Sequence, residues 1–314
     1  MRARREEIFL RQASFCDGRS PLYAALCRRL AGDGRVDRIA PDLRWDLPLR
    51  LLGGLHYLVL AGRAAWDDVD GALDEHGDFL ARHAAEQQVQ TNEVQRAWAL
   101  LPAFLSLHDG RPFDLVELGP SAGLNLLWDR YAYRYRTGSW GVSALTLSGD
   151  DRIPPPAELL QREVRVVRRR GIDLSPVDVT TEHGARVLES FVWADQTERL
   201  ERLRRAIAIL RAEPPELIRG DYADGLARLL ADRVPGSHLV VFQTASTMYL
   251  TAEQLGRVGE ALREAARHEP LSYLGTANGA ADSGYSLEVE RRPAGSNERL
   301  AVFDFHGEWL EWSG

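Results

Sequence analysis

The chain has 314 residues, of which 45% are apolar and 27% are charged, and its formal net charge is −7. This composition is typical of a globular protein with one large domain or two modest ones. The negative charge disfavours broad binding to a phosphate backbone, so we expect no nucleic-acid partner. The sequence shows neither a signal-peptide pattern nor an apolar run of membrane-spanning length, so we expect a cytoplasmic protein with no membrane association.

The sequence contains two cysteines, Cys16 and Cys27. They lie eleven residues apart with no histidine pair nearby, which matches no zinc-site spacing. We therefore expect both to be small buried core residues, and we expect no metal site. Such low cysteine usage also fits a reducing compartment.

The first third of the chain has helical periodicity. Leucines recur three or four residues apart, as at Leu22, Leu26 and Leu30, and no strand-like alternation is visible. We expect residues 1–110 to form an all-helical N-terminal region that acts as a lid.

The pattern changes near residue 113, where short apolar runs begin to alternate with amphipathic helices. This alternation is typical of a parallel sheet with helices on its faces. We assign residues 111–314 to this domain, with an inserted loop or small hairpin at about 137–160, where glycines and prolines gather. The expected strands are 115–118, 164–167, 216–219, 238–242 and 271–274, and the expected helices include 200–210 and 255–265.

The C-terminal part reads as an antiparallel hairpin. The alternating runs 286–290 and 300–305 are joined by a turn-forming segment at 293–297. A mostly parallel sheet closed by such a strand pair is the arrangement of class I methyltransferases. The predicted fold class is therefore α/β, a class I methyltransferase-like doubly wound sheet with a C-terminal antiparallel hairpin, preceded by the all-helical region.

A glycine-containing loop follows the first predicted strand. The pattern is Glu117-x-Gly119-x-Ser121-x-Gly123, with an apolar strand before it and a helix after it. It resembles the first motif of S-adenosylmethionine (SAM)-dependent methyltransferases, except that serine replaces the middle glycine. The resemblance implies SAM as cofactor, with Glu117 beneath its amino-acid portion; a structural cap of the turn is the alternative. Ser121 either narrows the approach of a ligand or hydrogen-bonds an anionic group at the helix N-terminus.

Acidic residues after the next two strands complete the expected cofactor site. The resemblance to the methyltransferase pattern implies that Asp173 accepts hydrogen bonds from both ribose hydroxyls, and its alternative role is that of a turn residue. The resemblance suggests that Asp221 reads the adenine amino group with Tyr222 near the ring. Asp221 is equally well explained as the N-cap of the following helix.

Short stretches spread over nearly the whole chain form a second, more specific pattern. They are Ser20–Tyr23, Gln90–Val94, Glu117–Leu126, Asp129–Tyr131, Gly171–Asp173 with Pro176 and Asp178, Trp193–Gln196, Gly220–Asp221 and His306–Trp309. Together they resemble a bacterial family catalogued as domain of unknown function 2332. The resemblance implies a Rossmann-like, methyltransferase-related fold with a helical N-terminal region, and it implies no established reaction. Gln243 departs from the pattern, which has histidine at this place, and so suggests a lost acid/base group or a changed substrate.

A dense run of polar residues at 88–96 lies inside the helical region. We expect it to hold a polar substrate above the sheet edge, although a solvated helix face is the alternative. The expected catalytic residues are Glu93 as a base, with Gln243 and Asn125. The expected substrate-binding residues are Gln90, Asn92, Arg96, Tyr131 and Thr244.

The sequence is compatible with three functions. The first is methyl transfer from SAM to a polar small molecule, in which positioning and desolvation carry most of the catalysis. The second is a SAM-independent ring closure or elimination on an amino-acid-like metabolite in specialised natural-product biosynthesis, with a partner subunit. The third is a non-catalytic ligand-binding scaffold. The sequence fixes neither the substrate nor whether the chain forms a homo- or hetero-oligomer.

Overall fold

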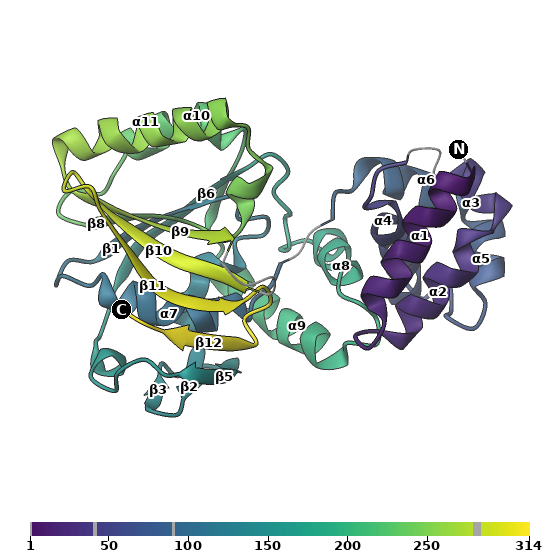
Figure 1. Ribbon diagram of the computed structural model, residues 1–314, viewed down its shortest axis with the longest axis horizontal. Helices are drawn as coiled ribbons and strands as arrows, with labels where there is room; N and C mark the ends of the chain where they lie inside the picture. Colours follow the sequence, from purple (N-terminus) through teal and green to yellow (C-terminus); the bar gives the residue numbers. More distant parts are fainter. Residues whose placement is uncertain (1, 40–42, 90–91, 279–283) are drawn as a thin grey trace. The chain divides into compact units, whose positions relative to one another are not determined.

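The computed structural model describes residues 2–39, 43–89, 92–278 and 284–314. The chain divides into two compact units, which we call the helical unit, Met1–Asn92 with Asp178–Arg204, and the sheet unit, Glu93–Val177 with Arg205–Gly314 (Figure 1). Each unit is therefore built from two separate stretches of chain, and the division falls within one long helix, α9 (Thr197–Ala212).

This division differs from a single boundary at residue 110. Helix α7 (Arg96–Ser106) belongs to the sheet unit because its buried side chains pack against two short 3-10 helices, η1 (Leu124–Arg130) and η2 (Leu159–Gln161). Helix α8 (Glu182–Ser190) belongs to the helical unit because it packs on α4 (Leu47–Leu60). Sequence periodicity identifies helices but does not say which core they join.

The helical unit is all-helical over the residues described, as the sequence predicts. Its core is lined by leucines and by both cysteines, which are fully buried, so the prediction of core cysteines is confirmed. The unit contains, besides α4, α8 and the first part of α9, the helices α1 (Arg2–Cys16), α2 (Pro21–Ala31), α3 (Gly34–Ile39), α5 (Val69–Glu75) and α6 (Gly77–Glu86).

Two of the short sequence stretches meet inside this unit. Ser20 is the N-cap of α2, where its hydroxyl oxygen accepts from the amide of Tyr23, and the same hydroxyl donates to Asp195 at 2.6 Å. Tyr23 stacks on Trp193 with ring centroids 5.8 Å apart. These stretches therefore stabilise the helical unit.

The sheet unit is built on a nine-stranded mixed sheet in the order β5-β12-β11-β10-β9-β8-β1-β6-β7. The strands from β7 to β9 are parallel, and those from β9 to β12 are antiparallel. The nine strands are β1 (Phe113–Leu118), β5 (Asp150–Ile153), β6 (Val166–Asp173), β7 (Glu216–Arg219), β8 (His238–Gln243), β9 (Leu271–Asn278), β10 (Gly284–Arg292), β11 (Ser296–Asp304) and β12 (Trp309–Trp312).

Helices cover both faces of this sheet (Figure 1). On one face α10 (Tyr222–Ala231) and α11 (Ala252–His268) pack over the aliphatic side chains of β1 and β8. On the other face Phe104 of α7 contacts Phe242 of β8, with ring centroids 5.2 Å apart. Burial on both faces explains why β1 and β8 read as continuous apolar runs.

The predicted C-terminal hairpin is confirmed, since β10 and β11 pair in antiparallel register. The structure extends it with β12 and with β5, which comes from the segment expected to be an insertion. The same segment forms a second small sheet in the order β3-β2-β4, from β2 (Ala132–Tyr135), β3 (Gly138–Trp140) and β4 (Thr146–Ser148).

The direction of β11 has a consequence for the site. β9 is parallel to β8, and β11 runs in the same sense as β9 because two antiparallel steps separate them. The arrowheads of β9 and β11 accordingly point the same way in Figure 1. The turn after β11 therefore lies at the same sheet edge as the carboxyl ends of β1, β6 and β8. Among the described residues no helix is both long and apolar enough to cross a membrane.

Candidate functional site

The carboxyl edge of the parallel strands gathers most of the residues expected to bind a ligand. β1 brings Glu117, β6 ends at Asp173 and β8 ends at Gln243. Glu117 is in register with Gly171 of β6 and with Phe242 of β8, so the three strand ends lie side by side. Strand order reverses around β1, and such a crevice is where doubly wound sheets bind ligands.

The loop after β1 needs left-handed backbone at three positions. Gly119, Ser121 and Gly123 have φ of 69°, 54° and 81°. A Cβ atom at Gly119 would come within 2.6 Å of Ser246, and one at Gly123 within 2.8 Å of Pro215. The glycines are thus required by the protein's own packing as well as by conformation.

Asp173 fixes the shape of this loop. Its Oδ2 accepts a hydrogen bond from the Ser121 amide at 2.8 Å, and its Oδ1 accepts one from the Ser175 amide at 2.8 Å. The carboxylate therefore stabilises the left-handed turn at Ser121, and the turn role weighed for it is observed. Its contact with a ribose stays a prediction.

Asp221 and Tyr222 lie at the start of α10. Asp221 is the N-cap, accepting from the Ala223 amide at 2.8 Å, and its second oxygen accepts from Gln254 of α11 at 3.1 Å. The Tyr222 ring lies 3.8 Å from the Cβ position of Gly119, so it packs against the loop. Contact of either residue with an adenine stays a prediction.

Glu117 has the most unusual environment at this edge. Its side chain is buried, and its Oε2 has no hydrogen-bond partner among the described residues. Burial, followed by the negative charge of Asp173, raises the pKa of Glu117 to about 8, while Asn125 and Arg96 act in the opposite direction. Asn125, from η1, also has a buried oxygen, Oδ1, without a partner among these residues.

Glu117 Oε2 and Asn125 Oδ1 are thus two buried oxygens that no hydrogen bond satisfies among the described residues. Buried polar atoms in folded proteins almost always have hydrogen-bond partners, and an unmet one destabilises the fold by about 1–3 kcal/mol. A primary ammonium group supplies three N–H donors and a positive charge, which suits a carboxylate beside an amide oxygen. Glu117 and Asn125 are therefore fitted to an amino group on a ligand.

Arg96 connects this site to the turn after β11. Its Nε donates to the Phe305 carbonyl at 2.8 Å, and its Nη1 donates to the Thr244 carbonyl at 3.4 Å. Its guanidinium also lies 5.7 Å from the ring centroid of Tyr285. The structure thus brings Arg96 and Thr244 together, although the contact to Thr244 is through the backbone.

Glu93 lies just before α7 and is buried. Its Oε1 accepts from the Gln95 amide at 3.2 Å, and its Oε2 lies 3.4 Å from Nδ1 of His306. The stretch His306–Trp309 belongs to the sequence pattern, but the pattern assigns no role to its histidine. Sequence alone does not show that His306 meets Glu93, because the two are more than 200 residues apart.

The remaining residues expected to bind substrate or to take part in catalysis are Gln90, Asn92, Gln243 and Tyr131. Gln90 lies outside the described residues, and Asn92 belongs to the helical unit. Gln243 is buried, and its Nε2 donates to the Thr276 carbonyl at 2.9 Å. Tyr131 is also buried, and its hydroxyl donates to the Leu124 carbonyl at 2.7 Å. Gln243 and Tyr131 thus have structural partners, and their functional roles stay predictions.

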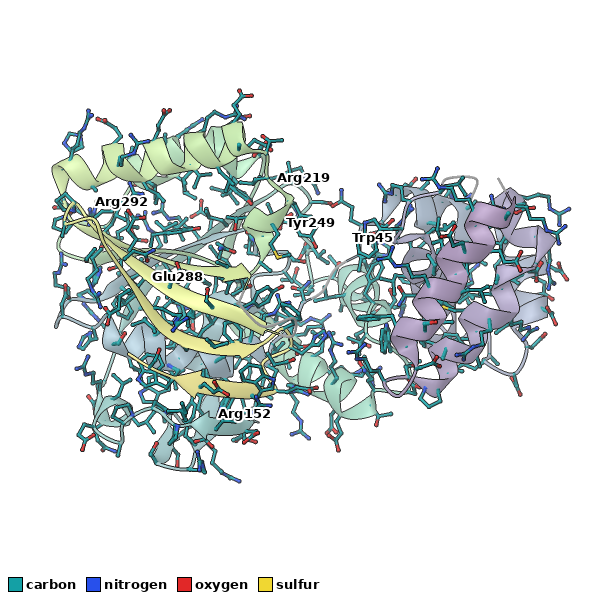
Figure 2. All side chains as sticks on the ribbon, viewed as in Figure 1. Trp45, Arg152, Arg219, Tyr249, Glu288 and Arg292 are labelled. Carbon is teal, nitrogen blue, oxygen red and sulfur yellow. The ribbon has the colours of Figure 1, made fainter. Side chains whose placement is uncertain are left out.

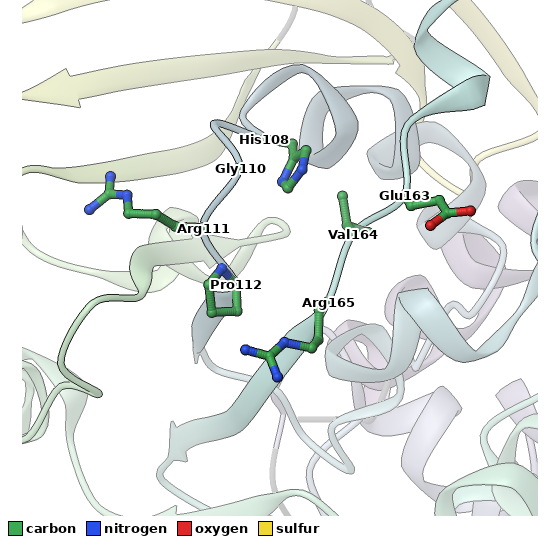
Figure 3. Close-up of a pocket in the computed structure, with 7 residues that line it drawn as sticks. All are labelled: His108, Gly110, Arg111, Pro112, Glu163, Val164 and Arg165. Carbon is green, nitrogen blue, oxygen red and sulfur yellow. The ribbon is translucent and has the colours of Figure 1, made fainter.

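A separate pocket lies at the opposite, amino edge of the sheet (Figure 3). It has a volume of about 310 Å³ and is bounded by the loop before β1 and the segment before β6, including His108, Pro112, Val164 and Arg165. It is remote from Glu117, which lies at the other end of β1.

The amino edge also holds a serine, a histidine and an aspartate in a row. Nε2 of His238 lies 3.0 Å from the Ser272 hydroxyl, and Nδ1 lies 3.3 Å from Asp109. The spacing is that of a nucleophilic triad, but Ser272 is only 3% exposed within β9. A substrate therefore has no access to the Ser272 hydroxyl. We interpret the three side chains as a structural contact that joins the amino ends of β8 and β9 to the loop before β1.

The described residues include no group of three or more histidine, cysteine or acidic side chains that could hold a metal ion. The fold and site thus define a mixed α/β protein, with a large mixed sheet that gathers polar side chains at one edge. Residues 6–312 match the family model described as "Uncharacterized protein conserved in bacteria (DUF2332)", and the chain belongs to that family. No curated protein and no solved structure matches the chain at a significant level.

Proposed function

We propose that the sheet unit is a small-molecule-modifying enzyme that binds SAM at the carboxyl edge and transfers its methyl group to a polar metabolite. The observation that carries the proposal is the buried Glu117, with one oxygen unpartnered among the described residues beside the unpartnered oxygen of Asn125. The ammonium of the methionine portion of SAM supplies the donors that both atoms lack.

The order of the parallel strands, β7-β6-β1-β8-β9, supports the proposal. In a Rossmann-like, methyltransferase-type sheet the first strand is central, and the cofactor lies across its carboxyl end. Glu117 and the loop from Gly119 to Gly123 occupy that place here. The antiparallel strands β10 and β11 correspond to the closing strands expected from the sequence.

A second candidate is a SAM-independent reaction, such as ring closure or elimination, on an amino-acid-like substrate. The specific observation in its favour is that Asp173 and Asp221 already accept backbone amides through their carboxylates. These are the two residues that a nucleoside would require. In this candidate Glu117 and Asn125 hold the amino group of the substrate itself, and the nucleoside contacts are not needed.

Titration calorimetry of the full chain with SAM and with S-adenosylhomocysteine separates the candidates. We expect a dissociation constant on the order of 10 µM for each ligand, and at least tenfold weaker binding for Glu117→Gln, because the neutral amide loses the charge-assisted hydrogen bond. Glu260→Gln is the matched control, because Glu260 is an exposed glutamate in the middle of α11 and belongs to none of the loops that follow the strands at the carboxyl edge.

Absence of binding by either ligand to a folded protein contradicts methyl transfer. If simple α-amino acids such as L-methionine then bind in a Glu117-dependent way, the second candidate is supported. If neither kind of ligand binds, both candidates are wrong. Asp173→Ala is not a suitable control, because it removes the acceptor of the Ser121 amide and so changes the loop itself.

A further inference from the structure

The turn after β11 presents a histidine at the edge where the ligand is proposed to bind. His306 follows the carboxyl end of β11, which runs in the same sense as β8 and β9. Arg96 fixes the position of this turn, because its Nε donates to the Phe305 carbonyl while its Nη1 reaches the Thr244 carbonyl after β8. Arg96 therefore links the turn that carries His306 to the segment that follows β8.

Further hydrogen bonds fix the backbone of this turn. The His306 amide donates to Asp304 at 2.6 Å, and Gln95 donates to the Gly307 carbonyl at 3.3 Å. Gly307 has φ of 78°, and a Cβ atom there would lie 2.6 Å from the Gln95 carbonyl oxygen. Such close backbone contact leaves little freedom for His306 to move away from Glu93.

Glu93 and His306 form a carboxylate–imidazole pair of unequal exposure. The Glu93 side chain is 3% exposed, that of His306 is 43% exposed, and Oε2 lies 3.4 Å from Nδ1. A carboxylate beside Nδ1 favours the tautomer with its proton on Nδ1, which leaves the Nε2 lone pair available. A buried acid that orients a half-exposed histidine is the arrangement of a general base.

We propose that His306, oriented by Glu93, accepts the proton of the methyl acceptor, and that this acceptor carries a hydroxyl on an aromatic ring. The inference rests on the proposed function. In the reaction the hydroxyl oxygen forms a bond to the methyl carbon as the carbon–sulfur bond of SAM breaks. The hydroxyl proton passes to Nε2 of His306, and the products are a methyl ether and S-adenosylhomocysteine. His306 is the catalytic residue in this step, and Glu93 is a positioning residue.

We infer an aromatic ring in the methyl acceptor because aromatic side chains surround the turn after β11. Phe305 is half-buried and packs edge-to-face on Tyr285 with centroids 4.5 Å apart. Tyr249, labelled in Figure 2, is 81% exposed and follows β8 in the chain. Rings of this kind stack on or meet the edge of a flat aromatic substrate.

The orientation of His306 is tested by its reactivity toward diethyl pyrocarbonate, measured by peptide mass spectrometry of the full chain. We expect modification of His306 to be roughly fivefold slower in Glu93→Gln than in wild type, because no carboxylate beside Nδ1 then favours the tautomer with a free lone pair on Nε2. Glu308→Gln, which removes an exposed carboxylate from the same turn, is expected to leave the rate unchanged. His268, at the exposed end of α11, is an internal reference.

The substrate class is tested by equilibrium dialysis with 4-nitrophenol and with 4-nitroanisole, which lacks the hydroxyl proton. We expect 4-nitrophenol to bind more tightly, and His306→Gln to weaken its binding roughly fivefold without affecting 4-nitroanisole. Equal modification rates in wild type and Glu93→Gln, or binding of the phenol that ignores His306→Gln, would overturn the inference. Failure of SAM binding alone leaves both results intact, and so is distinguishable.

Discussion

Replacing Glu117 by glutamine is expected to stabilise the protein at alkaline pH by about 5 kcal/mol. The pKa of Glu117 is raised from 4.5 to about 8 by burial. Between these two pH values the folded protein holds a proton that the unfolded chain releases, so the free energy of unfolding falls as the pH rises through this window. A pKa difference of one between the two states corresponds to about 1.4 kcal/mol, and glutamine matches the neutral carboxyl without the titration.

Urea unfolding at pH 5, 7 and 8.5 measures this effect. The difference between Glu117→Gln and wild type is expected to grow from about 1 kcal/mol at pH 5 to nearly its full size at pH 8.5. Glu260→Gln, on the exposed face of α11, is expected to follow the wild type at every pH. A constant difference across the three pH values would mean that Glu117 is ionised in the folded protein, and the account of its burial would be wrong.

Acid is expected to destabilise the helical unit through two buried histidines. Burial lowers the pKa of His56 and of His83 from 6.5 to about 4. Between these values the unfolded chain binds protons that the folded protein excludes, so the free energy of unfolding falls as the pH drops from 6.5 to 4. At pH 5 the expected loss is roughly 2 kcal/mol for each histidine.

The two histidines differ in their partners, which makes them separable. Nδ1 of His56 lies 3.3 Å from the Ser190 carbonyl, whereas Nε2 of His83 is buried without a partner among the described residues. We therefore expect His83→Gln to reduce the loss of unfolding free energy between pH 7 and pH 5 by about half. His76→Gln, at a half-buried site in the same unit, is the control. An unchanged pH dependence in His83→Gln would show that His83 does not contribute.

Local pattern is enough to predict the elements with strong periodicity. The strand at 216–219 coincides with β7, and the strand at 238–242 with β8, because both segments are short apolar or β-branched runs between clear turns. The hairpin at 286–305 is equally predictable, because apolar and polar residues alternate along both of its strands. The N-cap role of Asp221 is also visible as an alternative, since aspartate before a helix has a known preference.

Long-range assembly is not predictable in the same way. The pairing of β5 with β12 joins residues that are more than 150 positions apart, and no local pattern records it. The division of the helices between two units depends on which core each face contacts, as α7 and α8 illustrate. In the site, the motif alone points to Glu117, whereas the meeting of Glu93 with His306 depends on the direction of β11.

The most direct test of the account is the number of protons exchanged when S-adenosylhomocysteine binds at pH 7. Calorimetry in two buffers of different ionisation enthalpy gives this number. Because the pKa of Glu117 is about 8 in the free protein, binding of an ammonium group is predicted to ionise it and release roughly one proton in wild type, and none in Glu117→Gln. Binding with no proton release in wild type would contradict the claim that Glu117 receives the amino group of the ligand.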